Sequence, residues 1–570
     1  MLHKNTQIKS GISGSFHKVF NSNYFSVSYT QFTFMVSLYF GVMLNLPIFL
    51  EFLKVTEGNP SVGILFLITI PITLVAAFNI IYSVFAFPYI VKPIIITLLV
   101  TSSLASFATL NYGTIFDLDM IENILQTDSS EAGSYYSSKA LIYFIFTGLL
   151  PSVWVLFAKL EVKDSIFKEI LSRVCSVLLS IVVILTVCAF FYKDYSSIGR
   201  NNKYMNMLIV PSHAYSSYKY IKKNYFVNPI EYKQVGTDAK ILPAKNGKPT
   251  LTIFVLGETA RSANISYNGY ERNTNPYTLE DDLISFQDTE SCGTATAHSV
   301  PCMFSSLNRN NYKKRIAKNS DNFINVLQHA GVSTLWIEND GGSKGVDKRT
   351  PSITIDRSEV NEFCDGNSCH DGVMLKDLKD RIDSIDDNND LFKQKNPNGD
   401  KFVAIHLMGS HGPTYWKRYP KEIGVFSPTC DRADIENCSD TQITNTYDNT
   451  IVYTDSIIHE AISILKDYSS EYNVALIYLS DHGESLGENG IYLHGYPYSF
   501  SPDEQRHVPF YLWMSDDFIS ERGINENCLR DIAKNSTVSH DNLFHTVLGM
   551  GGVISEAINP DLDLIQKCKS

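Results

Sequence analysis

The chain lacks long apolar runs beyond Tyr192, although 44% of its 570 residues are hydrophobic. Runs of that kind are confined to the first third, at residues 32–50, 62–87, 90–110, 141–158 and 174–192. Each is close to the ~20 residues that a helix needs to cross a ~30 Å hydrocarbon layer. A buried helix of a soluble protein could imitate one such run, but five in succession favour five transmembrane helices.

Acidic residues outnumber basic residues in the remainder of the chain. Of the 48 Lys and Arg and the 60 Asp and Glu, residues 1–200 hold 12 and 11, which leaves residues 201–570 with a net charge of −13. Contact with nucleic-acid phosphates requires a basic surface, so the sequence argues against nucleic-acid binding.

The N-terminus lacks the short apolar core and small-residue cleavage site of a secretory signal peptide, so we expect the first span to remain as an anchor. Basic residues precede the first span and separate the fourth from the fifth, whereas the loop at 111–139 is acidic. The positive-inside rule then places the N-terminus inside and everything after Tyr192 outside. We expect a transmembrane domain at 1–192, a bridging linker at 193–248 and an outer domain at 249–570.

Cysteine is sparse, and the CxxC spacing that is typical of zinc ribbons is missing. Two of the 10 cysteines lie in the fifth span, and the others fall outside it as Cys292 and Cys302, Cys364 and Cys369, Cys430 and Cys438, and Cys528 and Cys568. An even set in an oxidising compartment predicts local disulfides. The last pair is proposed only because its two cysteines are left over, and zinc ligation is the competing interpretation.

The outer domain alternates two patterns. Short, nearly continuous apolar runs at 251–257, 333–339, 401–409, 474–481 and 508–514 are typical of strands buried on both faces. Between them, segments such as 322–331 and 449–468 show helical spacing, and the first ends in a glycine suited to a C-cap. This alternation predicts an α/β sandwich with a largely parallel sheet, whose chemistry gathers at the carboxyl ends of the strands.

Carboxylates and imidazoles follow these strands, namely Glu258, His411, Asp481, His482, Glu484 and, on a Gly-rich loop, His494. Such a mixed set, converging from separate strand ends, is typical of a divalent metal site and favours Zn²⁺ over Mg²⁺ or Ca²⁺. Polar strand ends are common, so an isolated Asp-His pair would be a weak signal.

The chain also lacks the GxSxG motif of a serine nucleophile elbow. It has instead a Thr-rich segment between two cysteines, SCGTATAHSVPCMFS at 291–305. A hydroxyl beside a metal becomes a usable nucleophile because the cation stabilises the alkoxide. In isolation, TAT is typical of a polar turn at the start of a helix. The cysteine frame and the neighbouring carboxylate-imidazole set favour a catalytic role.

Five motifs together carry a family resemblance: MIENILQTDSSEA, VLGETARSANISYNGYERNTNP, SCGTATAHSVPCMF, GSHGPTYWKRYP and YLSDHGESLGENGIYLHG. Through them, and over nearly its whole length, the chain resembles the lipid A phosphoethanolamine transferases, including the mobile colistin-resistance enzymes, of the alkaline phosphatase superfamily. The resemblance implies an N-terminal five-helix transmembrane domain plus a C-terminal α/β sandwich domain of the alkaline phosphatase and sulfatase type.

The resemblance also implies roles for individual residues. Thr296 corresponds to the nucleophile, and Glu258, Thr296, Asp481 and His482 correspond to the ligands of a zinc ion. His411 and His494 match histidines that hold a second zinc or the substrate phosphate and protonate a leaving oxygen. The remaining substrate-binding positions are Tyr112, Asn123, Thr127 and Glu131 in the outer loop, with Thr294, Lys344 and Glu484 nearer the nucleophile.

The implied reaction moves phosphoethanolamine from phosphatidylethanolamine to a phosphate of lipid A through a phosphoethanolamine-threonine intermediate, with release of diacylglycerol. The enzyme would be a monomer in the inner membrane of a Gram-negative bacterium, with one zinc ion or two and its catalytic domain in the periplasm. Its product carries an added ammonium group, which would lower the affinity of polymyxins such as colistin.

Three positions depart from residues that relatives often carry: Asp340 stands where Asn is common, Gly372 where an acidic residue is common, and His298 where Val is usual. We expect Asp340 to adjust contact with the head group and His298 to pack beside the site rather than bind metal. These departures leave the reaction type in place and the donor and acceptor preference open.

Other functions stay open at this point. Phosphoglycerol transferases and lipid phosphodiesterases of the same superfamily could use similar zinc and threonine chemistry. Outside the enzymes, a transporter or a non-catalytic envelope scaffold is conceivable. The spans show no evident internal repeat and few ionisable residues, which argues against a transporter. A scaffold would keep its role without Thr296.

Overall fold

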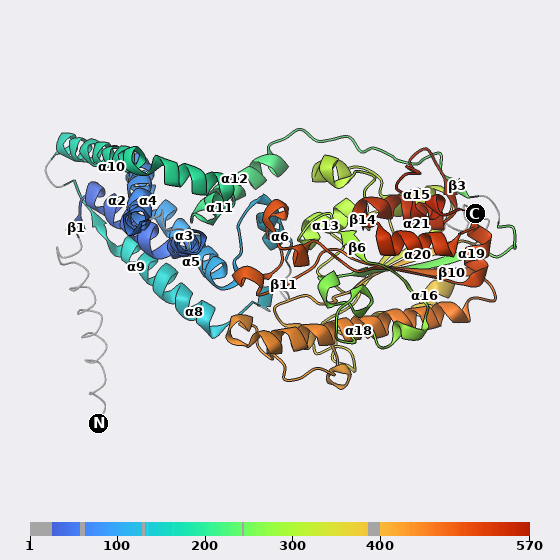
Figure 1. Ribbon diagram of the computed structural model, residues 1–570. Helices are drawn as coiled ribbons and strands as arrows, with labels where there is room; N and C mark the ends of the chain where they lie inside the picture. Colours follow the sequence, from blue (N-terminus) through green and yellow to red (C-terminus); the bar gives the residue numbers. More distant parts are fainter. Residues whose placement is uncertain are drawn as a thin grey trace, which may run out of the picture. The chain divides into compact units, whose positions relative to one another are not determined.

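The computed structural model describes residues 26–57, 63–127, 132–133, 135–162, 165–241, 244–385 and 399–569 (Figure 1). The chain divides into two compact units, the first made of Met1–Asp117 and Ser137–Lys219, the second of Leu118–Tyr136 and Tyr220–Ser570. The outer loop between the third and fourth expected spans therefore groups with the second unit. The expected domain boundaries at residues 192 and 248 stay predictions.

Four helical segments of the first unit are long and apolar enough to cross a membrane: α4 (Ile64–Val84), α5 (Val91–Tyr112), the stretch Ser138–Phe157 and α10 (Ile166–Asn201). The first expected span is a pair of helical segments, Tyr29–Leu44 and Leu46–Thr56, bent by 48°. Among the described residues, the number of candidate spans is thus four, or five if the bent pair counts as one. Pro47, in the first turn of the second segment, lacks an N–H group and its ring displaces the preceding turn, which favours a break there.

Small residues let the helices of the first unit pack closely against one another. A Cβ atom on Gly41 would lie 2.9 Å from the backbone nitrogen of Val75, and one on Gly148 would lie 2.9 Å from Cβ of Ser103. Asn79 Nδ2 of α4 donates to the Oγ atoms of Ser176 and Ser180 on α10, at 2.8 and 2.9 Å. Small residues at helix interfaces and interhelical hydrogen bonds of this kind hold helices together in lipid.

The second unit contains a seven-stranded sheet. Its order is β5 (Ile284–Phe286), β13 (Phe510–Met514), β10 (Asn473–Ser480), β4 (Thr250–Gly257), β9 (Lys401–His406), β7 (Ser333–Glu338) and β8 (Ser352–Thr354). Within this sheet β13 runs antiparallel to both neighbours, and the other pairings are parallel. The largely parallel sheet and its five long strands are confirmed. β5 and β8 were not predicted, because three residues are too few for a recognisable apolar run.

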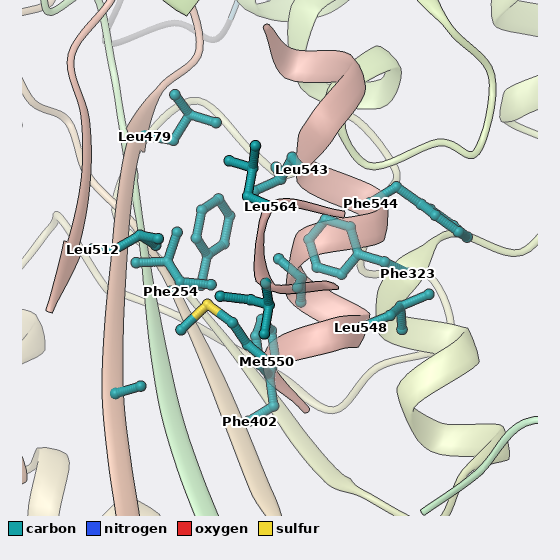
Figure 2. Close-up of a cluster of buried hydrophobic side chains, with 14 of the residues drawn as sticks. Phe254, Phe323, Phe402, Leu479, Leu512, Leu543, Phe544, Leu548, Met550 and Leu564 are labelled. Atoms are coloured by element: carbon teal, nitrogen blue, oxygen red, sulfur yellow. The ribbon is translucent and has the colours of Figure 1, made fainter. Parts of the chain in front are cut away.

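Helices cover both faces of this sheet (Figure 1). The long helix α18 (Asp440–Asp467) lies along one face, and α15 (Phe323–His329), α20 (Glu526–Asn535) and α21 (Leu543–Met550) lie along the other. Phe254, Phe402 and Leu479 project from the strands toward α21, where Leu543 and Phe544 meet them (Figure 2). α18 begins earlier than its apolar spacing predicts, because Ser439 caps its N-terminus and bonds reciprocally with Gln442.

All four predicted disulfides are present in the second unit: Cys292–Cys302, Cys364–Cys369, Cys430–Cys438 and Cys528–Cys568. The predicted pairs are confirmed, including the pair proposed by elimination. Each bridge except the last closes a short loop, so these three fix local shape more than global stability.

Candidate active site

The candidate site forms where neighbouring strands end. β10 and β4 pair in parallel up to Ser480 and Gly257, so Asp481 and Glu258 leave the sheet side by side. The Asp481 N–H donates to the Gly257 carbonyl at 3.0 Å, which continues the ladder by one step. The carboxyl ends of parallel strands are where α/β sheets place chemistry.

Four predicted ligands surround a single point. Thr296 Oγ1 lies 3.2 Å from both carboxylate oxygens of Glu258 and 3.2 Å from His482 Nε2. His482 Nε2 lies 3.5 Å from Glu258 Oε1 and 3.4 Å from Asp481 Oδ2. Four ligands placed tetrahedrally at ~2.1 Å from a zinc ion would be about 3.4 Å apart. Glu258, Asp481 and His482 also form one of the two described groups with metal-binding geometry.

The electrostatics of this set suit a cation. Burial, followed by the charges of Asp481 and Asp340, raises the pKa of the Glu258 carboxyl well above its ordinary value. Burial likewise raises the pKa of Asp481, whose Oδ2 atom is buried and accepts no hydrogen bond within the described residues. Buried carboxylates in mutual contact resist ionisation until a positive charge joins them.

His482 is prepared as a neutral ligand. Burial and the neighbouring His494 lower its pKa to about 3. Its Nδ1 atom donates to the Gly483 carbonyl at 2.9 Å, which leaves the lone pair on Nε2, the atom that faces Thr296. A backbone carbonyl that fixes the tautomer in this way is typical of metal-bound histidine. The residues present therefore fit a zinc ion.

The Thr296 side chain is held from two directions. Thr296 is the first residue of α13 (Thr296–Met303), and the Cys292–Cys302 disulfide ties the loop before that helix to its far end. Ser299 Oγ donates to the Asp481 carbonyl, so the helix is also bonded to the metal-ligand loop. The clamp inferred from the cysteine frame is thus present in the structure.

His540 is a further positioning residue, which the sequence analysis did not identify. Its Nε2 atom donates to the Ser480 carbonyl at the end of β10, and its Nδ1 atom accepts from the Cys292 N–H, each at 3.0 Å. It thereby links the disulfide to the sheet. No local motif surrounds His540, so only the fold reveals it.

His411 and His494 lie together on one side of His482. Their ring centroids are 5.3 Å apart, and the His494 ring is 4.6 Å from that of His482. Glu484 belongs to neither of the described metal-binding groups. It accepts from His494 Nδ1 at 2.9 Å and from the Tyr415 hydroxyl at 2.7 Å, so it orients the His494 ring.

Two other predicted substrate positions make backbone contacts. Thr294 Oγ1 donates to the Tyr496 carbonyl at 2.6 Å, which fixes the loop that precedes the nucleophile. Lys344 Nζ donates to the Gly341 carbonyl at 2.9 Å and lies 3.8 Å from Asp340 Oδ2. Asp340 therefore places a carboxylate beside Lys344, a predicted substrate-binding residue.

The outer loop contributes α6 (Leu118–Gln126), which belongs to the second unit and packs against α13. Glu122 pairs with Lys314 at 2.8 Å and with Lys318 at 3.2 Å. Asp119 Oδ2 lies 3.6 Å from His298 Nδ1, and His298 contributes to neither described metal-binding group.

The residues predicted to contact the donor lipid are distributed over both units. Asn123 is half-buried on α6, and its carbonyl accepts from Thr127 Oγ1 at 2.9 Å. Tyr112 ends α5 in the first unit. Glu131 lies outside the described residues. Their contact with a lipid stays a prediction.

The departure to Gly372 has a steric reason. Its N–H donates to the Tyr453 hydroxyl at 2.9 Å, and a Cβ atom there would lie 3.0 Å from that oxygen and 2.9 Å from the Phe363 ring. An acidic side chain at this position would displace one of the two rings.

Known proteins resemble both parts of the chain. The sulfatase family model matches residues 250–553, and the model for the phosphoethanolamine transferases EptA and EptB matches residues 74–225. Phosphoethanolamine transferase EptA of Escherichia coli K12 is 35% identical over 95% of this chain and 98% of its own length. Phosphatidylethanolamine transferase Mcr-1 of Escherichia coli is 34% identical over 89% of this chain and 92% of its own.

A solved structure agrees over the full length. The integral membrane lipooligosaccharide phosphoethanolamine transferase A (EptA) of Neisseria meningitidis superimposes with a TM-score of 0.88 and 33% identity, over 95% of this chain and 99% of that one. Identity above 30% across both parts shows common descent of the whole architecture, and the resemblance inferred from the five motifs is confirmed. The chain is a multi-pass membrane protein that belongs to the phosphoethanolamine transferase family of the alkaline phosphatase superfamily.

Proposed function

We propose that the protein transfers phosphoethanolamine from phosphatidylethanolamine to a phosphate of lipid A, with Thr296 as the nucleophile. The observation that carries the proposal is the position of Thr296 Oγ1, 3.2 Å from Glu258 and from His482 in a buried ligand set. The names of two relatives support the substrates, since one is a phosphatidylethanolamine transferase and another a lipooligosaccharide phosphoethanolamine transferase.

Glu258, Thr296, Asp481 and His482 would hold one zinc ion. When bound, the ion would stabilise the threonine alkoxide and offset negative charge on the phosphoryl oxygens. The chain's own contribution is to keep the Thr296 hydroxyl within reach of this set, through the disulfide and the Ser299 contact.

In the first step, Thr296 Oγ attacks the phosphorus of phosphatidylethanolamine. A P–O bond forms to threonine, and the P–O bond to diacylglycerol breaks. The diacylglycerol oxygen takes up a proton, and His411 and His494 are the imidazoles beside His482 that can supply it. The product of this step is phosphoethanolamine-threonine.

In the second step, an oxygen of a lipid A phosphate attacks the same phosphorus. The new P–O bond joins phosphoethanolamine to lipid A, and the P–O bond to Thr296 breaks. Thr296 then recovers its starting state, so the scheme is ping-pong. Both substrates are lipids, which accounts for a catalytic unit that is tethered to membrane spans.

The location follows from the disulfides. Four bridges in the second unit require an oxidising compartment, which in a Gram-negative cell is the periplasm. The spans would then lie in the inner membrane. Each phosphoethanolamine adds an ammonium group to lipid A, which would weaken binding of polymyxin and colistin.

Mass spectrometry of lipid A from cells with and without the gene tests the proposal. Wild type should add one phosphoethanolamine mass to lipid A, Thr296→Ser should retain part of this activity, and Thr296→Ala should lose it while folding normally. Transfer of glycerol phosphate, release of free phosphoethanolamine without an acceptor, or activity of Thr296→Ala would overturn the proposal.

A further inference from the structure

A second buried group of metal-binding atoms lies beside the first and shares Glu258 with it. Glu258, Asp340 and His406 each offer a ligand atom within 4.8 Å of the others, and their exposed fractions are 0%, 7% and 0%. They come from the ends of three neighbouring strands, β4, β7 and β9. The parallel register pairs His406 with Leu256 on one side and with Glu338 on the other, so the three side chains converge.

The His406 ring is held in the orientation of a metal ligand. Its Nδ1 atom donates to Glu338 Oε2 at 3.1 Å, and the same oxygen accepts from Trp336 Nε1 at 2.9 Å. Glu338 thus serves as an acceptor, which places the ring proton on Nδ1. Metal-bound histidines commonly donate their second ring nitrogen to a carboxylate in this way.

The other ring nitrogen of His406 faces the group. Nε2 is buried, has no hydrogen-bond partner within the described part of the chain, and lies 3.9 Å from Asp340 Oδ2. That separation is too long for a hydrogen bond. It exceeds by about half an ångström the ~3.4 Å between tetrahedral zinc ligands at ~2.1 Å each, so the two side chains would move slightly closer around an ion.

The group places two carboxylates, those of Glu258 and Asp340, next to one imidazole in a buried space. Lys344 Nζ, 3.8 Å from Asp340 Oδ2, is the competing source of positive charge.

We propose that Glu258, Asp340 and His406 form a second zinc site, with Glu258 bridging it to the first. One imidazole and two carboxylates are a ligand set that zinc accepts, and the open positions would take water or a phosphoryl oxygen. This site differs from the second zinc expected at His411 and His494. It depends on Asp340, and it rests on the proposed function only through the shared Glu258.

Zinc content of the purified full-length protein in detergent, after dialysis against a low-zinc buffer, tests the proposal. Elemental mass spectrometry should give two equivalents for wild type and one each for Asp340→Asn and His406→Gln. Asp481→Asn removes a ligand of the first site alone, so it should lose one equivalent but keep the zinc that depends on Asp340. Melting temperatures confirm that each variant is folded, and Asp340→Asn is close in size and shape to the original residue.

One equivalent in wild type that persists in Asp340→Asn would overturn the second site and leave the first intact. If Lys344 is instead the counter-ion of Asp340, wild type holds one equivalent and Lys344→Gln gains a second, which also overturns the proposal. No equivalent in wild type would contradict the zinc chemistry of the proposed function as well.

Discussion

The two units bury polar groups for different purposes. In the first unit, buried Asn and Ser side chains bond to neighbouring helices, as Asn79 does with Ser176 and Ser180. In the second unit, Glu258, Asp340 and Asp481 crowd together at one edge of the sheet, and Asp481 Oδ2 lacks a partner within the described residues. Hydrogen bonds between neutral side chains specify packing, whereas a crowded set of carboxylates weakens the fold unless a cation binds. The contrast separates positions that hold helices together from positions proposed to bind metal.

The largest effect should come from Glu258→Gln. The change removes a shared ligand and should abolish zinc binding and lower transfer by roughly 10³-fold or more. Stability of the metal-free protein should not fall, because one of several buried like charges is lost. Elemental analysis, lipid A mass spectrometry and thermal unfolding measure these effects. Glu359→Gln, at an exposed position, is the control. A Glu258→Gln protein that retains zinc would contradict the assignment of the crowded carboxylates to metal binding.

Removal of zinc by a chelator should act on one unit only. At a free zinc concentration about 1,000 times the dissociation constant, bound metal stabilises the fold by about 4 kcal/mol. Chelation should therefore speed hydrogen-deuterium exchange in peptides from β4 and β10 and leave peptides from α5 unchanged. Equal acceleration in both units would show that they unfold together and would break the distinction between them.

Two disulfides of the second unit offer a matched pair. Replacing Cys292 and Cys302 by Ser should lower transfer by about 10- to 100-fold, because the loop that carries Thr296 loses its clamp. The same replacement of Cys364 and Cys369, whose loop contains none of the four zinc ligands, should leave transfer nearly unchanged. Initial rates of head-group transfer measure both. Equal losses in the two double variants would show that disulfides act on global folding rather than on nucleophile position.

The smallest effect should come from the first unit. Asn79→Ala removes two interhelical hydrogen bonds and should lower the free energy of unfolding by about 1 kcal/mol. Transfer per folded molecule should stay unchanged, since the residue only packs helices. Thermal unfolding in detergent and initial rates provide the measurement. A specific activity that falls without a change in stability would assign α4 a role in catalysis.

Short-range patterns in the sequence predicted those features of the fold that neighbouring residues determine. Strands buried on both faces leave apolar runs, so β4, β7, β9, β10 and β13 could be identified. The residues that follow them included three of the four proposed ligands, and Thr296 lies in the Thr-rich segment between two cysteines. His540 and His406 could not be found in this way, because each acts through partners far away in the sequence. The bend in the first span was missed since hydropathy records length and not the effect of Pro47. The grouping of α6 with the second unit depends on ion pairs with Lys314 and Lys318, which no periodicity encodes.

The position of α6 matters for anyone who shortens the protein to study it. A fragment that begins after the last span would omit this helix and leave Lys314, Lys318 and His298 without their acidic neighbours. Its surface beside the nucleophile helix would be more cationic than in the intact enzyme. Inhibitors selected on such a fragment would be drawn toward anionic compounds whose binding surface the full-length protein already covers with its own helix.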